Sequence, residues 1–197
     1  MYDVVNSRYT YKNSDVIINK LDIKDAELLK EYETSIVALK LTSLAKNKKV
    51  YPFTEEGIKN IHKYLFEEIY DFAGEYRLEN ITKENFRFSE YEYIEENMDL
   101  IIKKIDINIL KKIEFDDLCK ALSEIMTDLN VLHPFREGNG RTIREFIREI
   151  AYVCGYSVNF SNVDYKLILD VSRKAVVDDT EQVELLKKIL KGYEISE

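Results

Sequence analysis

"LHPFREGNGRT", residues 132–142, is the stretch around which this 197-residue sequence is organised. The chain has six glycines, two prolines and two histidines, and this stretch holds two of the glycines, one proline and one histidine. Proline ends a helix, and glycine adopts backbone conformations that are barred to other residues. The stretch therefore predicts a tight loop between a helix that ends near His133 and a second helix that begins near Asn139 or Gly140.

Helical periodicity is strong on both sides of this loop. Before it, the apolar residues between Phe115 and Leu132 fall on one stripe at about 3.6 residues per turn. After it, a step of about 100° per residue places Arg141, Arg144 and Arg148 within a sector of about 60°. The opposite face of that second helix carries the apolar residues Ile143, Phe146, Ile147 and Ile150. One face is therefore expected to pack in the core, while the other carries three arginines.

When the loop is considered with it, the arginine face is better interpreted as part of a binding site than as a solvated basic surface. The first N–H groups of a helix have no intrahelical partner and the helix dipole favours an anion, so amides and guanidinium groups together make a polyphosphate site. Gly138 and Gly140 let the backbone approach such a ligand closely. Glu137 would repel phosphate unless a cation lay between them, and Mg²⁺ binds through one or two carboxylates plus phosphate oxygens.

His133 completes this constellation, because an imidazole with an ordinary pKa of about 6.5 suits proton abstraction at neutral pH. The stretch predicts a site for a Mg²⁺-bound nucleotide polyphosphate beside a general base. The predicted reaction is transfer of a phosphorus group to a hydroxyl, and the spacing leaves open which phosphorus atom is attacked.

The rest of the chain also has a mostly helical pattern. Helices are predicted over residues 24–46, from the N-cap Thr54 to about Phe72, and from about Ile94 to Ile105. Two more are predicted over "VDYKLILDVSRKAV", 163–176, and "DDTEQVELLKKIL", 178–190, with Asp179 or Thr180 as the cap of the second. The alternation in "FRFSEYEY", 86–93, indicates a short β-hairpin near residues 85–92, called the flap below.

These patterns predict an all-α fold with one small β excursion. We expect a single domain over residues 1–197, made of an N-terminal helical region (1–50), a core with the flap and the 132–142 stretch (51–155), and C-terminal helices (156–197). The net charge of −8 argues against a general nucleic-acid binder. Cys119 and Cys154 are expected to be reduced, buried thiols. No signal peptide or membrane span is recognisable, so the expected location is the cytoplasm.

"HPFREGNGRTIR", 133–144, closely resembles the signature of the Fic domain family, HPF-x-[D/E]-G-N-G-R-x-x-R. The resemblance continues in "YTYKNSDVIINKLDIKDAELL", 9–29, and in "HKYLFEEIYDFAGEYRLENITKENFRF", 62–88. It covers residues 1 to about 190, and its most specific part is the 133–144 motif. It implies a Fic-type helical domain, most members of which move AMP from ATP to a Tyr, Thr or Ser hydroxyl of a protein.

The resemblance also implies a role for each motif residue. His133 would deprotonate the target hydroxyl, Glu137 would hold Mg²⁺ between the α- and β-phosphates, and Phe135 would anchor the loop in the core. The implied nucleotide-binding residues are Gly138, Asn139 and Gly140, as an anion hole, and Arg141 and Arg144, on the β- and γ-phosphates.

The flap would dock the target protein. By the resemblance, the segment that presents the target hydroxyl pairs in β-fashion with the flap, a form of strand addition. The residues concerned are Arg87, Phe88, Ser89 and Glu90. The alternative interpretation is a short hairpin that only covers the core. His62, in "IKNIHKYLF", has no comparable context and is treated as an ordinary helix residue.

Other activities of the same pocket stay open. One family variant with lysine at the second motif glycine is a kinase, and Gly140 here favours AMP transfer instead. Nucleotide donors other than ATP remain alternatives. A catalytically silent nucleotide-binding protein is a further alternative, against which the intact His133 and Glu137 argue.

Many Fic proteins are held inactive by a helix with the pattern [S/T]-x-x-x-E-[G/N], whose glutamate pairs with the arginine that corresponds to Arg144. The nearest match is "TEQVEL", 180–185, which has Glu184 but lacks the following Gly or Asn. The inhibitory glutamate would come from a separate small antitoxin, or from sequence beyond Glu197, or the enzyme would be unregulated. We favour the antitoxin.

The resemblance to the family also leads to expectations about partners. By family analogy, DNA gyrase and topoisomerase IV are candidate targets. A homodimer is compatible with the resemblance, whereas direct binding of nucleic acid or membrane is not expected.

Overall fold

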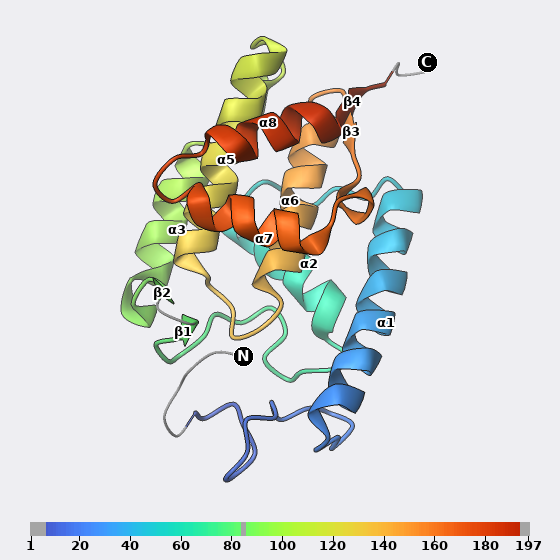
Figure 1. Ribbon diagram of the computed structural model, residues 1–197, viewed down its shortest axis with the longest axis vertical. Coiled ribbons are helices and arrows are strands. Elements are labelled where there is room, and N and C mark those ends of the chain that lie inside the picture. Colours follow the sequence, from blue (N-terminus) through green and yellow to red (C-terminus); the bar gives the residue numbers. More distant parts are fainter. Residues whose placement is uncertain (1–6, 84–85, 194–197) are drawn as a thin grey trace.

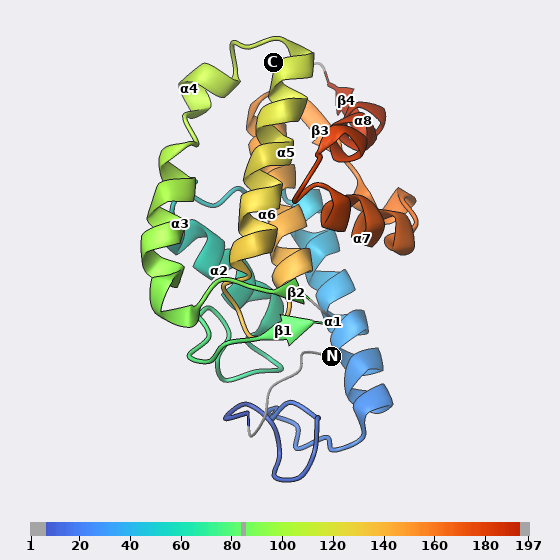
Figure 2. The ribbon, with the colours of Figure 1, turned by 60° about the vertical axis from the view of Figure 1, so that its left-hand side comes forward.

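Two antiparallel helices joined by the motif loop form the centre of the protein (Figure 2). These are α5 (Phe115–Leu132) and α6 (Asn139–Val153), in a computed structural model that describes residues 7–83 and 86–193. Both helices lie where the sequence predicts them. The apolar face of α6 is fully buried, at Ile143, Phe146, Ile147 and Ile150.

The N-terminal half of the chain packs around this pair (Figure 1). Helix α2 (Glu55–Phe66) contacts α6, α3 (Ile94–Lys103) contacts α5, and α1 (Ala26–Lys46) packs on α2. Side-chain caps fix where two of these helices begin. Asp25 accepts a hydrogen bond from Leu28 N, and Thr54 accepts one from Gly57 N, which confirms Thr54 as the predicted N-cap.

Helix α2 is shorter than its apolar pattern predicts, because it ends at Phe66 rather than near Phe72. The following residues form turns that end at Gly74, whose φ of +87° suits only glycine without strain. The carbonyl of Ile69 accepts a hydrogen bond from Lys20 N, so this segment bonds to the N-terminal segment instead of continuing the helix.

The predicted N-terminal helical region is only partly helical. Residues 7–25 form turns with an isolated bridge between Thr10 and Ile17, and α1 is the helix of this region; residues 1–6 lie outside the described part. Asn13 and Asp22 adopt positive φ, and Asn19 Oδ1 accepts hydrogen bonds from the amides of residues 21 and 23. These local bonds compete with helix formation.

The C-terminal part contains the two predicted helices, α7 (Tyr165–Lys174) and α8 (Thr180–Ile189), and α8 packs on α5. It also contains elements that were not predicted: the antiparallel strands β3 (Tyr156–Val158) and β4 (Leu190–Gly192), and a short 3-10 helix. Each strand has three residues, too few for an alternating pattern to stand out. The last four residues, 194–197, lie outside the described part.

The first hairpin confirms the predicted flap in part. Strand β1 (Thr82–Lys83) pairs antiparallel with β2 (Phe86–Arg87), so the strand within the predicted range covers two residues, and Asn85 lies outside the described part. The chain then passes through a 3-10 helix, Tyr91–Tyr93, into α3. A further short helix that was not predicted, α4 (Ile107–Leu110), precedes α5. The fold class, helical with small β-hairpins, is as expected.

Two smaller findings complete the fold. Cys119 and Cys154 are free thiols, with Cys119 buried and Cys154 partly exposed. Among the described residues, no helix is both long and apolar enough to span a lipid bilayer.

Candidate active site

His133 occupies an unusual position at the end of α5. Its backbone is left-handed, with φ of +49°, and its N–H donates to Leu129 O, which closes the helix. Its ring nitrogen Nδ1 lies 3.0 Å from Asn130 O. A carbonyl only accepts hydrogen bonds, so Nδ1 carries the hydrogen and Nε2 carries the lone pair. The geometry thus presents His133 as a proton acceptor through Nε2.

Two features keep this imidazole neutral. Its ring stacks on Phe88 of the flap, with centroids 3.9 Å apart. Burial, with the positive charges of Arg77 and Lys83 acting in the same direction, lowers the pKa of His133 to about 3, below the 6.5 of an ordinary imidazole. A histidine held neutral at physiological pH is in the protonation state that a general base needs.

The motif loop is held by its own asparagine. Asn139 Oδ1 accepts from Phe135 N at 2.8 Å, and its Nδ2 donates to Phe135 O at 2.7 Å. Asn139 and Phe135 are both buried. The Asn139 side chain is therefore committed to the loop, and what it can offer an anion is the backbone amide at the start of α6.

Two glycines make close contacts on either side of Asn139. Gly138 has φ of +79°, and a Cβ built there would lie 2.3 Å from the ring of Phe66. A Cβ on Gly140 would lie 3.1 Å from the guanidinium of Arg144. Gly138 requires the absence of a side chain for backbone and packing reasons, whereas a side chain at Gly140 would make a tight contact that Arg144 would have to relieve by a small shift.

His62 packs against this loop and bonds to it, so the interpretation of His62 as an ordinary helix residue is wrong. Its Nδ1 accepts from Gly74 N at 2.8 Å, so Nε2 donates to Glu137 O at 2.9 Å. The fully buried ring stacks on Phe135 at 3.9 Å. The sequence signal was available: His62 lies on the apolar face of α2, where a polar side chain needs specific partners.

Arg141 lies between two carboxylates. Its Nη2 is 2.6 Å from Glu33 of α1 and 3.5 Å from Glu137, and the guanidinium lies over the ring of Phe66. Glu33 also accepts a short hydrogen bond from Tyr70 Oη. Sequence reasoning did not select Glu33. Its place in the buried stripe of α1, four residues from each of two buried apolar residues, is the signal that could have revealed it.

Arg144 differs from its two neighbours on the arginine face. In the part of the chain that the structure describes, no carboxylate lies within salt-bridge distance of it, and its guanidinium lies 6.0 Å from the ring centroid of Tyr165. Burial lowers its pKa. Arg148, by contrast, donates to both carboxylate oxygens of Glu145. Of the three arginines on the predicted face, Arg144 is therefore the half-buried one that has no acidic partner among the described residues.

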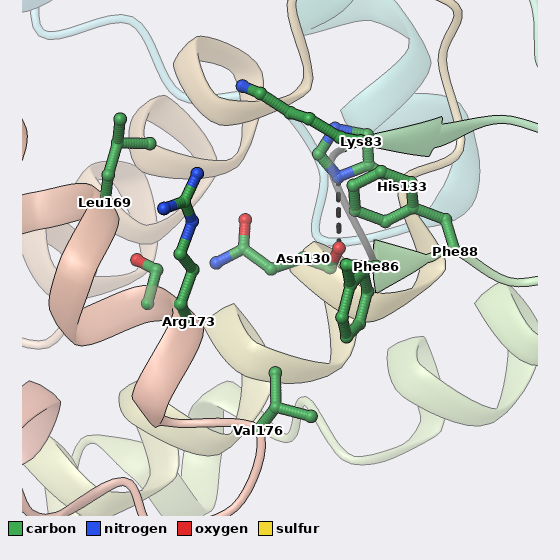
Figure 3. A pocket seen from close by; sticks show the side chains of 9 residues that line it. Lys83, Phe86, Phe88, Asn130, His133, Leu169, Arg173 and Val176 are labelled. Carbon is green, nitrogen blue, oxygen red and sulfur yellow. Dashed lines mark hydrogen bonds between the residues drawn. The ribbon is translucent and has the colours of Figure 1, made fainter. Parts of the chain in front are cut away.

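A cavity of about 410 Å³ opens beside His133, between the flap and α7 (Figure 3). The flap aromatics and His133 lie on one side of it, while Leu169 and Arg173 lie on the other. Its lining residues are Lys83, Phe86, Phe88, Asn130, His133, Leu169, Ser172, Arg173 and Val176. Aromatic rings with a few polar groups are the lining typical of a small-molecule site.

The predicted docking residues of the flap behave differently from one another. Phe86 and Arg87 of β2 are exposed. Glu90 pairs with Arg87 at 2.5 Å and accepts from Asn80 Nδ2, while Ser89 N donates to Val131 O. The outer part of the flap is open to a partner, whereas its base is bonded to the domain.

A metal ion at Glu137 would need ligands from elsewhere. Within residues 7–83 and 86–193, no group of three or more His, Cys, Asp or Glu side chains is arranged to hold one. Glu137 Oε1 accepts from Gly138 N at 2.8 Å, and its side chain is 30% exposed. One accessible carboxylate beside an anion site suits Mg²⁺ that arrives with a polyphosphate, because Mg²⁺ retains waters and phosphate oxygens as ligands.

Comparisons with known proteins show the family to which the chain belongs. The profile of the Fic/DOC family matches residues 52–151. Protein adenylyltransferase VbhT of Bartonella schoenbuchensis (strain DSM 13525 / NCTC 13165 / R1) is 34% identical over 83% of this chain, and the match spans 34% of VbhT. A protein of Escherichia coli (strain K12) named "Probable protein adenylyltransferase Fic" is 23% identical over 90% of this chain and 88% of its own length.

Solved structures share the fold. The BepC protein from Bartonella tribocorum with bound AMPPNP has a TM-score of 0.88 at 21% identity, covering 94% of this chain and 97% of that one. The N-terminal Fic domain of a Bep effector from Bartonella quintana with bound ADP has a TM-score of 0.89 at 23% identity, covering 94% and 95%. The chain spans about a third of VbhT, 34%, but nearly all of these domains.

Proposed function

The chain belongs to the Fic/DOC family, and from this premise we propose that it transfers AMP from Mg²⁺-bound ATP to a Tyr, Ser or Thr hydroxyl of a target protein. The observation that carries the proposal is the setting of His133. Its Nδ1–H bonds to Asn130 O, so the Nε2 lone pair is the basic one, and the residue lines the cavity between the flap and α7.

The phosphate chain would bind at the start of α6. The first backbone N–H groups of the helix, at Asn139 and the two flanking glycines Gly138 and Gly140, would donate hydrogen bonds to the phosphate oxygens as an anion hole. Arg141 would contact the β-phosphate and Arg144 the γ-phosphate. Arg144, which is half-buried and has no acidic partner in the described part of the chain, would gain most from an incoming anion.

Mg²⁺ would be held by Glu137 and the phosphates together. It would neutralise charge that otherwise repels the Glu137 carboxylate, and would stabilise the pyrophosphate as it leaves. The residues present fit this role: Glu137 is accessible and already lies 3.5 Å from Arg141, on the same side of the loop.

The cavity beside His133 would take the nucleoside and the acceptor. The rings of Phe86 and Phe88 offer apolar surface to a base, and Asn130, Ser172 and Arg173 offer polar groups. The acceptor hydroxyl would approach along the exposed strand β2, lose its proton to Nε2 and attack the α-phosphorus. The bond from that phosphorus to the β-bridging oxygen would break and release pyrophosphate.

Restraint of this activity would come from a separate protein. Glu184, the nearest candidate in the chain for an inhibitory glutamate, lies 3.3 Å from Lys187 and not at Arg144. An antitoxin that places a glutamate on Arg144 would block the γ-phosphate site. A toxin of this kind would act in the cytoplasm, with DNA gyrase and topoisomerase IV as candidate targets by family analogy.

The test uses ATP labelled separately at the α- and γ-phosphates, incubated with Mg²⁺, the protein and a bacterial lysate. We expect label from the α-position alone to appear on a lysate protein, and His133→Ala to abolish it while binding of an ATP analogue is retained. Label from the γ-position would instead identify a kinase. Nucleotide binding without label from either position would identify a binding protein or a different donor.

A further inference from the structure

Arg77 is a buried arginine whose guanidinium donates to four backbone carbonyls. It lies between α2 and β1, and its side chain is 1% exposed. Nε donates to His133 O at 2.8 Å, and Nη1 donates to Glu79 O at 2.8 Å. Nη2 donates to two further carbonyls, those of Leu132, at 3.2 Å, and Ser89. The acceptors belong to three segments: its own loop, the end of α5 and the base of the flap.

These bonds satisfy backbone carbonyl groups that would otherwise lack hydrogen-bond partners. The last carbonyls of a helix lack intrahelical partners, and a left-handed residue such as His133 turns its carbonyl away from the helix. A guanidinium presents five donors in a rigid planar fork, which can hold several carbonyls at fixed angles. The backbone of the same residue adds a further bond, from Arg77 N to Pro134 O at 2.9 Å.

The same fork fixes the flap to the helix that carries His133. Ser89 O accepts from Arg77, while Ser89 N donates to Val131 O. The next residue towards β2, Phe88, stacks on the imidazole. Ser89 is thus clamped on both sides between Arg77 and α5, and the exposed strand β2 ends two residues before it.

We propose that Arg77 is a positioning residue, which sets the distance and register of the flap relative to Nε2 of His133. A hydroxyl that reaches the site along β2 can meet the imidazole only if this register is kept. Arg77 lines neither the cavity nor the phosphate site, so its loss should affect the acceptor far more than the nucleotide. The expected effect of Arg77 on AMP transfer rests on the proposed function, whereas its expected effect on the position of the flap does not.

The experiment compares Arg77→Met and Arg77→Lys with the wild type and with Arg148→Met. Arg148 is the control, because it is an arginine that is mostly removed from solvent, with its side chain 13% exposed, but is bonded to Glu145 on α6. The acceptor is the lysate protein that the wild type labels from α-labelled ATP, after purification. Steady-state kinetics with this acceptor, and affinity for a non-hydrolysable ATP analogue, are measured for each variant.

For Arg77→Met we expect kcat/KM for the acceptor to fall on the order of 100-fold, since a misplacement of about 1 Å has this effect on a positioned reaction. Affinity for the ATP analogue should stay within about twofold, and Arg77→Lys should restore part of the rate because it retains some of the hydrogen bonds. Wild-type kinetics in Arg77→Met, or equal losses for nucleotide and acceptor that Arg148→Met reproduces, would overturn the proposal.

Hydrogen exchange separates this inference from the proposed function. In Arg77→Met the amides of Ser89 and His133 should exchange at least about tenfold faster than in the wild type, while those in the middle of α6 are unchanged. This result would uphold the clamp even if the wild type transfers no AMP. Unchanged exchange at both amides would reject the clamp whatever the activity.

Discussion

The carboxylate of Glu33 lies 2.6 Å from the guanidinium of Arg141, so a residue of the first helix holds a motif arginine. Glu33 also accepts a hydrogen bond from the hydroxyl group of Tyr70. The short bonds and the burial make this a fixed contact between α1 and α6. Arg141 is therefore positioned before any phosphate arrives, with Glu137 on its other side.

We expect Glu33→Gln to lower the free energy of unfolding by about 2 kcal/mol, because a buried charged hydrogen-bond partner is replaced by a neutral one. Urea denaturation measures the change. The control is Glu31→Gln, an exposed residue of the same helix, which should stay within about 0.5 kcal/mol of the wild type. Equal stability of the two variants would show that the Glu33–Arg141 pair does not stabilise the fold.

Arg144 and Arg148 should respond in opposite ways to replacement by methionine. Arg144 is a half-buried cation without an acidic partner among the described residues, so Arg144→Met should leave stability unchanged or raise it. Arg148→Met leaves the carboxylate of Glu145 without its arginine partner. It should lower the free energy of unfolding by about 3 kcal/mol.

The same two variants should diverge in nucleotide binding. Arg144→Met should weaken binding of Mg²⁺-bound ATP at least about tenfold, whereas Arg148→Met should not change it, because a charge-assisted bond to phosphate is lost only in the first. Calorimetry on both variants provides the comparison. A stable Arg144→Met protein with wild-type affinity would remove Arg144 from the phosphate site.

Much of the site could be predicted from the sequence, because its chemistry is concentrated in one loop and the helix after it. The periodicity around residues 132–142 located α5 and α6, and the residue types indicated an anion site beside a base. What the sequence could not predict are partners brought in from distant segments. Glu33, His62 and Arg77 each bond to the loop or to the helix ends around it, through contacts set by tertiary packing.

The elements that were missed or misjudged have local physical causes. Strands β3 and β4 have three residues each, so pairing between distant segments rather than periodicity creates them. Helix α2 ends early because the turn that follows it is fixed by bonds to Lys20 and to His62. The N-terminal turns depend on Asn19, whose side chain makes the bonds that a helix backbone would otherwise make.

Gly138 and Gly155 allow the effect of backbone conformation to be separated from that of packing. Both have positive φ, +79° and +91°, but an added Cβ meets Phe66 at 2.3 Å at the first and nothing within 4 Å at the second. Gly155→Ala should lower the free energy of unfolding only through strain of the backbone at positive φ, by about 1–2 kcal/mol. Gly138→Ala should cost more and also weaken binding of the ATP analogue, because Phe66 also supports Arg141. Equal costs, by denaturation, would mean that the Phe66 contact relaxes freely.

Glu149 gives the protein a stability that falls as the pH rises. The residue is fully buried on α6; its Oε2 accepts from Tyr51 N, and Oε1 lies 3.8 Å from Arg148. Burial, with the negative charge of Glu145 acting in the same direction, raises the pKa of Glu149 from its usual 4.5 to about 8. Between these two pKa values the folded protein binds a proton that the unfolded chain has released. The stabilisation is complete below pH 4.5 and is lost as the pH rises through about 8.

Glu149→Gln should remove this dependence, because glutamine is neutral in both states. We expect the free energy of unfolding of the wild type, relative to that of Glu149→Gln, to fall by about 3–4 kcal/mol between pH 5 and about 8.5. Urea denaturation at a series of pH values gives the difference directly, and other titrating groups cancel between the two proteins. A difference that does not vary with pH would mean that Arg148 keeps Glu149 ionised in the folded protein.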